Sequence, residues 1–364
     1  MALEFAVELN PAPATDDRVA EVLRAPGFGR VFTDHLAIAR WTAERGWHDA
    51  RIQPYGPLSL DPATHVFHYS QTIFEGFKAY RQPDGSIATF RPQANGERFN
   101  RSAKRMALPS LPVEDFVAAA DLLVRTDARW VPSEPGTSLY LRPLMMATEV
   151  GLGVRPASDV TFLVIASPAG SYFSGGVKPV SIWVSEEYTR AAPGGTGAAK
   201  TGGNYASSLI AQQEAIENGC EQVLFLDAVE RRWVEELGGM NVCVVLDDGS
   251  LVTPELSGSI LEGVTRDTII TLLRDLGRDV EERRIDIDEV RKGIESGRVV
   301  EVFACGTAAV VTSIGRLAWR SSSGAISDVT LPAATAVAEE VRTNLIALQE
   351  GRAADPHGWL HFVP

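Results

Sequence analysis

The sequence predicts a two-domain protein of mixed α and β structure. Its 364 residues are about twice the length of an average domain, and 45% of them are hydrophobic, as in ordinary globular chains. Strand and helix signals alternate in both halves, and a segment rich in glycine, serine and proline, Ser167–Lys178, separates them. We therefore expect an N-terminal domain over residues 1–173, a linker over 174–186 and a C-terminal domain over 187–364.

The first half predicts a hairpin, two helices and two strands. Aromatic and β-branched runs in residues 77–92 flank Pro83-Asp84-Gly85, a sequence that favours a turn. The elements expected after the hairpin are helices over 95–107 and 113–129, and strands over 137–147 and 159–167.

The second half continues in the same style. Its expected helices are Tyr205–Asn218, which ends at Gly219, and Thr265–Leu276, which ends at Gly277. The expected strands are 180–185, 222–227 and 298–305, together with a hairpin over 241–254 that turns at Asp248-Gly249. The pattern indicates an α/β chain with strands both in hairpins and before helices.

Composition and charge exclude several classes of protein. The formal net charge of −13 argues against a nucleic-acid partner, because such binding needs a concentrated basic face. The N-terminal segment does not resemble a secretory signal, and no apolar run reaches the length of a membrane span. The three cysteines are an odd number at wide spacings, which suits neither a disulfide framework nor a zinc site. The six histidines lack a spacing typical of metal ligands. We expect a cytoplasmic protein without a metal site that acts on small molecules.

Lys200 is the first candidate functional residue. It is one of five lysines and lies in the glycine-rich stretch PGGTGAAKTGGNYA. Three interpretations are open: a solvated lysine on a surface loop, a nucleotide phosphate loop at Gly194–Thr201, and a lysine that forms a Schiff base with pyridoxal phosphate. The phosphate-loop pattern needs glycine where Ala199 stands, and Gly202 and Gly203 would weaken the helix that must follow.

The Schiff-base interpretation requires two groups besides the lysine amine. Pyridoxal phosphate needs an anion at its ring nitrogen and an anion-binding site for its phosphate. Glu235 and Glu236 stand at a predicted strand start and can supply the carboxylate, although adjacent glutamates more often face solvent. Gly263-Val264-Thr265 precedes a predicted helix, and Gly306-Thr307 follows a predicted strand. Both can bind phosphate through N–H groups and hydroxyls, or simply cap their elements.

Seven ordered strings carry a resemblance to a known family. They are FGRVFTDHLAIARW, HYSQTIFEGFKAYR, SLYLRP, AAKTGGNY, EELGGMNV, EGVTRD and FACGTAAV, and they span residues 28–310. In this order they resemble branched-chain amino-acid aminotransferases of pyridoxal-phosphate fold type IV, in the class IV aminotransferase family. The resemblance implies a smaller N-terminal α/β domain, a larger C-terminal α/β pseudo-barrel domain and a cofactor at their interface.

The resemblance also implies roles for individual residues. Lys200 matches the Schiff-base lysine, Tyr205 the tyrosine on the cofactor's phenolic oxygen, and Glu236 the carboxylate at the pyridine nitrogen. The other matches on the cofactor side are Arg98, with Arg101 as its nearby rival, Leu261, Gly263, Val264, Thr265, Gly306 and Thr307. The matches on the substrate side are Phe28, Tyr69, Phe74, Tyr140, Arg142, Val154, Tyr172, Gly239 and Ala308.

The implied activity is a reversible ping-pong transamination. L-leucine, L-isoleucine or L-valine passes its amino group to 2-oxoglutarate, which yields a branched 2-oxo acid and L-glutamate. This reaction is the last step of branched-chain amino-acid biosynthesis or the first step of degradation. An apolar pocket discriminates one methylene by only about 1 to 3 kcal/mol, so all three amino acids should be accepted. The loop Gly151–Val154 matches one that reaches the neighbouring active site, which implies a homodimer.

The chain departs from some relatives, and rival assignments remain. Ala309 and Thr312 stand where some animal relatives carry a redox CxxC pair, so a thiol switch of that kind is not expected. Gly239 stands where those relatives have a threonine. A contact made by the threonine hydroxyl therefore cannot exist in this chain. D-amino-acid aminotransferase and aminodeoxychorismate lyase are rivals of the same fold type. A nucleotide-hydrolysing enzyme and a catalytically silent homologue are rivals from other classes.

Overall fold

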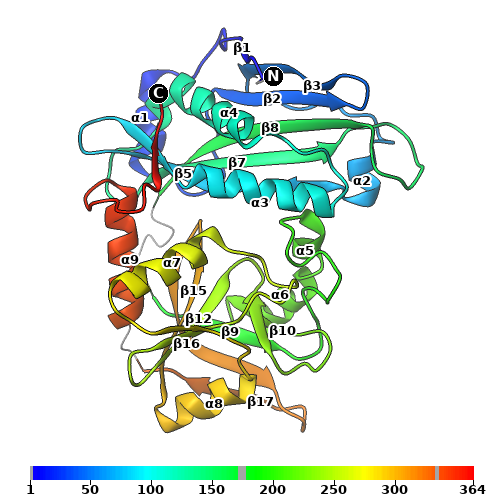
Figure 1. Cartoon of the computed structure of the whole chain (residues 1–364). Coiled ribbons are helices and arrows are strands. Elements are labelled where there is room, and N and C mark those ends of the chain that lie inside the picture. Colours follow the sequence, from blue (N-terminus) through cyan, green and yellow to red (C-terminus); the bar gives the residue numbers. More distant parts are fainter. Residues whose placement is uncertain (1–2, 171–177, 333–335) are drawn as a thin grey trace. The chain divides into compact units, whose positions relative to one another are not determined.

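The computed structural model describes residues 3–170, 178–332 and 336–364 (Figure 1). The chain packs as two compact units. The first unit holds the described parts of Met1–Ser174, Ala199–Gly202 and Ile346–Pro364, and the second holds those of Gly175–Ala198 and Gly203–Leu345. Within the described ranges, no helix is long and apolar enough to cross a membrane, and no group of His, Cys, Asp and Glu side chains could hold a metal ion.

The first unit is built on one sheet that contains both parallel and antiparallel strands. Its strands are β1 (Ala6–Val7), β2 (His35–Thr42), β3 (Gly46–Pro54), β4 (Thr72–Phe74), β5 (Phe77–Arg81), β6 (Ile87–Phe90), β7 (Ser138–Ala147), β8 (Asp159–Ala169) and β18 (Leu360–Phe362). They follow the order β1-β3-β2-β8-β7-β5-β6-β18, with β4 paired to β7. Most residues of β7 and β8 are buried, which explains why both strands are almost continuously apolar in sequence.

Two helices pack against this sheet, and one of them carries candidate site residues. The helical elements of the first unit are α1 (Asp16–Arg24), α2 (His65–Tyr69), α3 (Pro92–Arg105), α4 (Val113–Thr126) and the 3₁₀ turn η1 (Ala128–Trp130). Phe99 of α3 and Phe116 of α4 pack on Phe162 of β8, with ring centroids 5.7 and 6.2 Å from it. Helix α3 therefore lies against the sheet with Arg98 and Ser102 buried.

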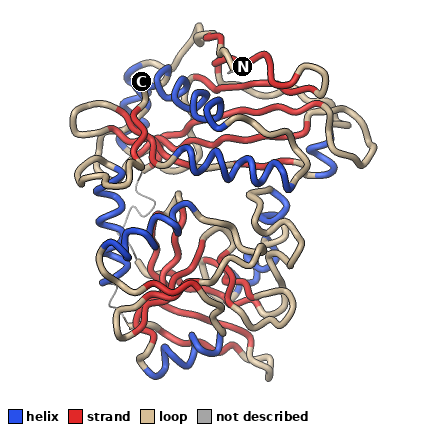
Figure 2. The backbone as a smooth tube through the Cα atoms, viewed as in Figure 1, coloured by secondary structure: helices blue, strands red, loops and turns tan. Residues whose placement is uncertain are grey.

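The second unit has its own mixed sheet (Figure 2). Its strands are β9 (Val180–Ser185), β10 (Gln222–Leu226), β11 (Val234–Leu237), β12 (Asn241–Leu246), β13 (Leu251–Thr253), β14 (Val280–Glu282), β15 (Val299–Gly306), β16 (Val310–Arg320) and β17 (Ile326–Thr330). The order is β11-β10-β9-β16-β15-β12-β13-β14, with β17 on β16. The helices in this part of the chain are α5 (Gly202–Ala206), α6 (Leu209–Glu217), α7 (Val264–Asp275), α8 (Ile287–Ser296) and α9 (Ala336–Gln349).

Both predicted hairpins are confirmed. The strands β5 and β6 join at Pro83-Asp84-Gly85, and β12 and β13 join at Asp248-Gly249. Gly85 and Gly249 have φ of +87° and +82°, a backbone conformation that side chains with a β-carbon rarely adopt. The turn residues therefore predicted correctly where each hairpin reverses.

The single helix predicted over Tyr205–Asn218 is wrong. The chain forms α5 and α6, with a break at Ser207 and Ser208. The hydroxyls of these serines donate to Asn204 O at 3.0 Å and Tyr205 O at 2.7 Å. Such side-chain bonds to the backbone compete with helical hydrogen bonds, which explains why an apolar pattern of helical spacing is interrupted here.

Two segments from the predicted C-terminal domain pack with the first unit. Thr201 forms a bridge with Ile73, next to β4. Near the C-terminus, β18 pairs antiparallel with β6, with Leu360 opposite Phe90. Local sequence patterns do not identify such distant partners, so the linear boundary at residues 174–186 could not include them.

Candidate active site

Lys200 is fixed by backbone bonds within the first unit. Its N–H donates to Ser102 Oγ at 2.9 Å, and its carbonyl accepts from Phe74 N–H at 3.0 Å. The next residue, Thr201, donates its hydroxyl to Thr72 O at 2.7 Å. The Lys200 backbone is therefore held between α3 and β4, and the residue is partly buried, which differs from a lysine on an exposed surface loop.

Aromatic and basic predicted residues gather around the Lys200 side chain. Its Nζ lies 4.9 Å from the centroid of the Phe74 ring, and Arg142 Cζ lies 4.8 Å from the same centroid. Arg142 Nη2 donates to the Tyr140 hydroxyl at 3.0 Å, and Tyr140 meets Phe28 edge to face at 5.0 Å. The first unit thus combines an amine, a guanidinium and aromatic surfaces in one place.

Arg98 forms a buried ion pair with a residue that sequence reasoning missed. Its Nε and Nη2 donate to the two carboxylate oxygens of Glu75 at 2.7 and 2.8 Å. Arg98 is 4% exposed and Glu75 is fully buried. Glu75 stands inside the string FEGF, but nothing in that string indicates which cation it binds. The fork fixes the guanidinium one helical turn before Ser102, the residue that holds the Lys200 backbone.

The loop expected to reach a second subunit projects from the first unit. The Tyr69 hydroxyl donates to Leu152 O at 2.6 Å, which ties α2 to this loop. Val154 is 83% exposed and Leu152 66% exposed, which is unusual for two apolar side chains so close in sequence. Tyr172, the remaining predicted pocket residue of this region, lies outside the described residues.

Glu235 and Glu236 are both buried in the second unit. They lie on β11, where Glu236 is 2% exposed, so the usual solvent-facing position of adjacent glutamates does not apply. Glu236 Oε1 accepts from Arg190 Nη1 and from Leu261 N–H, each at 2.8 Å. Arg190 was not predicted. Burial raises the pKa of Glu235, whose carboxylate hydrogen-bonds Ser259.

The start of α7 is shaped by a close contact between two residues. Gly263 is the N-cap of α7 and provides no side-chain cap for the first-turn N–H groups. A β-carbon at Gly263 would lie 1.9 Å from Asn241 Oδ1, so only glycine fits there. Asn241 Nδ2 in turn donates to Leu261 O at 3.0 Å. Asn241 therefore fixes the segment that leads to Val264 and Thr265.

Two turns of the second unit lie side by side. A β-carbon at Gly306 would lie 3.3 Å from Met240 Cγ and 3.7 Å from Gly239 O, which brings the end of β15 next to the turn between β11 and β12. A β-carbon at Gly239 would lie 3.6 Å from Tyr205 Cε1. Gly239, Tyr205 and the start of Gly306-Thr307-Ala308 are thus brought together.

These residues fit the chemical needs of pyridoxal phosphate within each unit. The first unit supplies the Lys200 amine and the Arg98 guanidinium. The second supplies a buried carboxylate on Glu236 and an α7 N-terminus without a side-chain cap, where glycine allows close approach. A helix N-terminus of this kind suits a phosphate, and a buried carboxylate suits a protonated ring nitrogen.

The family model of class IV amino-transferases matches residues 72–317. The chain belongs to this family. The probable branched-chain-amino-acid aminotransferase of Streptomyces coelicolor is 57% identical to it over 98% of this chain and 98% of the relative. The branched-chain-amino-acid aminotransferase of Mycobacterium tuberculosis is 54% identical over 99% of this chain and 98% of the relative.

Solved structures agree with this membership. The Escherichia coli branched-chain amino acid aminotransferase matches with a TM-score of 0.73 at 28% identity, over 90% of this chain and 100% of that chain. The Thermobaculum terrenum branched-chain amino acid aminotransferase, solved in its PLP form, has a TM-score of 0.69 at 25% identity, over 90% of this chain and 98% of that chain. This class IV aminotransferase is therefore a transaminase that uses pyridoxal phosphate.

Proposed function

We infer that this chain is a branched-chain amino-acid aminotransferase that exchanges the amino group between L-leucine, L-isoleucine or L-valine and 2-oxoglutarate. The observation that carries the inference is the grouping of Lys200, Phe74, Tyr140 and Arg142 in the first unit. It combines a reactive amine with an apolar aromatic wall and a cation. The names of relatives at 57% and 54% identity support the same activity.

Lys200 would bind the aldehyde of pyridoxal phosphate, Glu236 its ring nitrogen, Tyr205 its phenolic oxygen and Leu261 its ring face. The residues that would bind its phosphate are Arg98, Gly263, Val264, Thr265, Gly306 and Thr307. When bound, pyridoxal phosphate supplies an electron-withdrawing ring that makes the substrate Cα proton acidic. Arg190 Nη1 lies 2.8 Å from Glu236 Oε1 and pairs with this carboxylate.

Lys200 moves the proton of the reaction. With the cofactor and substrate bound, the free Lys200 amine would take the proton from the substrate Cα. The bonds from Lys200 N to Ser102 and from Lys200 O to Phe74 keep the backbone in place while the side chain moves.

The substrate site combines apolar and cationic surfaces. Phe28, Phe74 and Tyr140 would contact the branched side chain. The resemblance also assigns Tyr69, Tyr172, Gly239 and Ala308 to substrate binding, with Ala308 at the substrate carboxylate. Arg142 binds the side-chain carboxylate of 2-oxoglutarate and glutamate. One pocket therefore accepts both an apolar and an acidic partner substrate.

A homodimer completes each site. Val154 and Leu152, exposed on the Gly151–Val154 loop, are suited to burial in a second copy of the chain. The enzyme acts in the cytoplasm, where its amino-acid and 2-oxo-acid substrates are dissolved. The predicted linker over 174–186 is not kept, because residues 180–185 form β9 within the sheet of the second unit.

Replacement of Lys200 tests the assignment. Lys200→Ala should abolish transamination of L-leucine with 2-oxoglutarate, because both the cofactor bond and the proton acceptor are lost. Lys104→Ala removes an exposed lysine on α3 and should leave turnover unchanged. Turnover is measured as glutamate formation. Retained turnover in Lys200→Ala would contradict the proposed function.

A further inference from the structure

Arg190 is a buried cation of the second unit that has no step of its own in the transamination proposed above. It lies in the chain after β9 and is 4% exposed. Its Nη1 pairs with Glu236 Oε1 at 2.8 Å and also donates to Ser259 O at 3.2 Å and to Gly197 O at 3.4 Å. A guanidinium removed from water needs such acceptors, because its charge is costly to bury without them.

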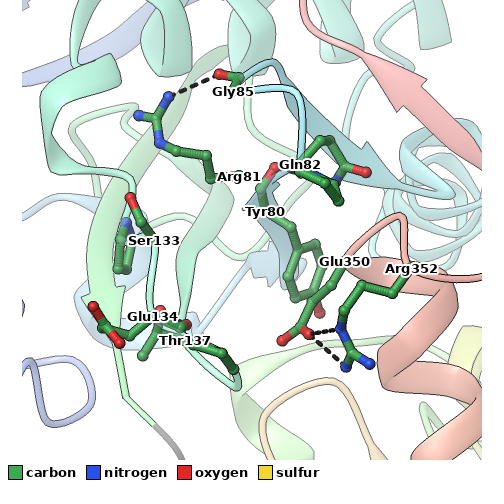
Figure 3. A pocket seen from close by; sticks show the side chains of 12 residues that line it. Tyr80, Arg81, Gln82, Gly85, Ser133, Glu134, Thr137, Glu350 and Arg352 are labelled. Carbon is green, nitrogen blue, oxygen red and sulfur yellow. Dashed lines mark hydrogen bonds and ion pairs between the residues drawn. The ribbon is translucent and has the colours of Figure 1, made fainter.

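An arginine–glutamate pair of the first unit shows how different this burial is. Arg352 Nη2 pairs with Glu350 Oε2 at 2.6 Å (Figure 3), but the Arg352 side chain is 51% exposed. Water stabilises that charge together with its partner. The Arg190 charge is stabilised by protein groups instead, so its position is set by the segments that it contacts.

Two of these segments lead to predicted cofactor residues. Ser259 lies two positions before Leu261, and Gly197 lies three positions before Lys200. A β-carbon at Gly197 would lie 2.0 Å from Ser259 O, so the two stretches of backbone can approach this closely only because residue 197 is glycine. Arg190 therefore binds the carbonyls of two segments at the point where they meet.

The segment that contains Gly197 is fixed by further hydrogen bonds. Thr196 Oγ1 donates to Asn204 Oδ1 at 2.6 Å, and Asn204 Nδ2 donates to Thr196 O at 2.8 Å. Asn204 belongs to α5 and lies directly before Tyr205. These bonds fix the backbone beside Gly197, whose carbonyl is one of the acceptors for Arg190.

The Glu236 carboxylate is bound by two donors at one oxygen. Its Oε1 accepts from Arg190 Nη1 and from Leu261 N–H, each at 2.8 Å. The first donor is fixed by the carbonyls of Ser259 and Gly197, and the second belongs to the backbone. A buried carboxylate with two fixed charge-assisted or backbone donors has a defined orientation.

We propose that Arg190 is a positioning residue of the transaminase, which fixes the Glu236 carboxylate in the orientation that binds the cofactor ring nitrogen. The inference rests on the proposed role of Glu236 and adds the residue through which that role depends on the rest of the fold. Arg190 acts through Glu236, so its removal should matter to the cofactor only where residue 236 is a glutamate. An arginine that served stability alone would leave cofactor affinity unchanged.

A double-mutant design tests this inference by titration of the cofactor-free, full-length chain with pyridoxal phosphate, followed by protein fluorescence. Arg190→Met should weaken binding about ten-fold when residue 236 is glutamate, because the carboxylate loses a donor that orients it. In the Glu236→Gln background the same change should weaken binding by less than about two-fold. Equal weakening in both backgrounds would overturn the inference.

Arg291→Met is the matched control. Arg291 Nη2 pairs with Glu186 Oε1 in the same unit, also at 2.8 Å, and its side chain is 12% exposed. Neither residue of this pair is a predicted cofactor residue. The variant should bind pyridoxal phosphate like the wild type.

Arg190→Lys extends the test to a variant that keeps the charge beside Glu236 and so preserves folding if Arg190→Met does not fold. It lacks the planar guanidinium, so binding should weaken about three-fold, again only where residue 236 is glutamate. Unchanged affinity in Arg190→Lys and Arg190→Met would overturn the inference. No substrate enters the titration, so a wild type that fails to transaminate L-leucine would contradict the proposed function alone.

Discussion

Each unit contains a buried arginine–glutamate pair, and the two pairs differ in how the carboxylate is used. In the first unit, Glu75 gives both oxygens to Arg98 in a fork. In the second, Glu236 receives Arg190 and the Leu261 N–H on the same oxygen, Oε1. Arg98 binds both carboxylate oxygens of Glu75. Arg190 binds one carboxylate oxygen of Glu236 and so helps to orient this carboxylate. The comparison suggests that Glu75 serves structure and that Glu236 serves chemistry.

The largest expected effect is on stability in the first pair. Glu75→Ala leaves the Arg98 charge buried without its carboxylate, and removal of one partner of a buried pair costs about 3 to 5 kcal/mol. The urea midpoint of unfolding, followed by circular dichroism, measures the loss. Glu97→Ala, an exposed glutamate of the same helix, is the control and should stay close to wild type. Equal stability of the two variants would remove the structural role of Glu75.

The second pair should show its effect on turnover. Glu236→Gln keeps the shape of the side chain but removes the charge that we propose faces the cofactor ring, so the rate should fall on the order of 100-fold with the cofactor still bound. Glu235→Gln changes the neighbouring buried glutamate, which contacts Ser259, and should change the rate only slightly. If both variants lose the same activity, the loss reflects damage to β11 rather than the role of Glu236.

Lys78 sharpens the comparison because it is a buried cation that can release its proton. Burial lowers its pKa from 10.5 to about 8. Between these values the unfolded chain holds the proton and the folded chain does not, so this contribution to stability grows with pH and is lost as pH falls through 8. From pH 8 to 9.5, wild type should gain about 2 kcal/mol relative to Lys78→Met. Urea unfolding at both pH values measures this, and a parallel pH response of the two proteins would contradict it.

The smallest expected effect concerns the start of α7. Gly263→Ala places a β-carbon on Asn241 Oδ1, which must move and take the Leu261 segment with it. We expect cofactor affinity to fall about ten-fold, measured by fluorescence titration with pyridoxal phosphate. Gly203→Ala, where an added β-carbon meets open space, is the matched control. Unchanged affinity in Gly263→Ala would mean that this helix start does not bind the cofactor.

The sequence predicted features that depend on local residues. Turn residues predicted both hairpins, and the resemblance identified Lys200, Phe74, Tyr140 and Arg142, which the structure brings together. These inferences rest on short sequence strings in which the type of each residue is enough to indicate its role. They do not require knowledge of what packs against them.

Partners from distant parts of the chain could not be predicted in this way. Glu75 and Arg98 are 23 positions apart, and Lys200 and Ser102 are 98 apart. Either glutamate of Glu235-Glu236 could have faced solvent, because burial of β11 depends on strands elsewhere in the sheet. Such pairings follow from tertiary packing, which a single sequence does not display.

The central claim is tested most directly by the visible absorbance spectrum of the purified holoenzyme during one cycle of substrates. The band of the bound cofactor should fade when L-leucine is added and return when 2-oxoglutarate is added, because each substrate carries out one half of the transamination. A band that responds to D-alanine but not to L-leucine, or no band after reconstitution with pyridoxal phosphate, would contradict the account.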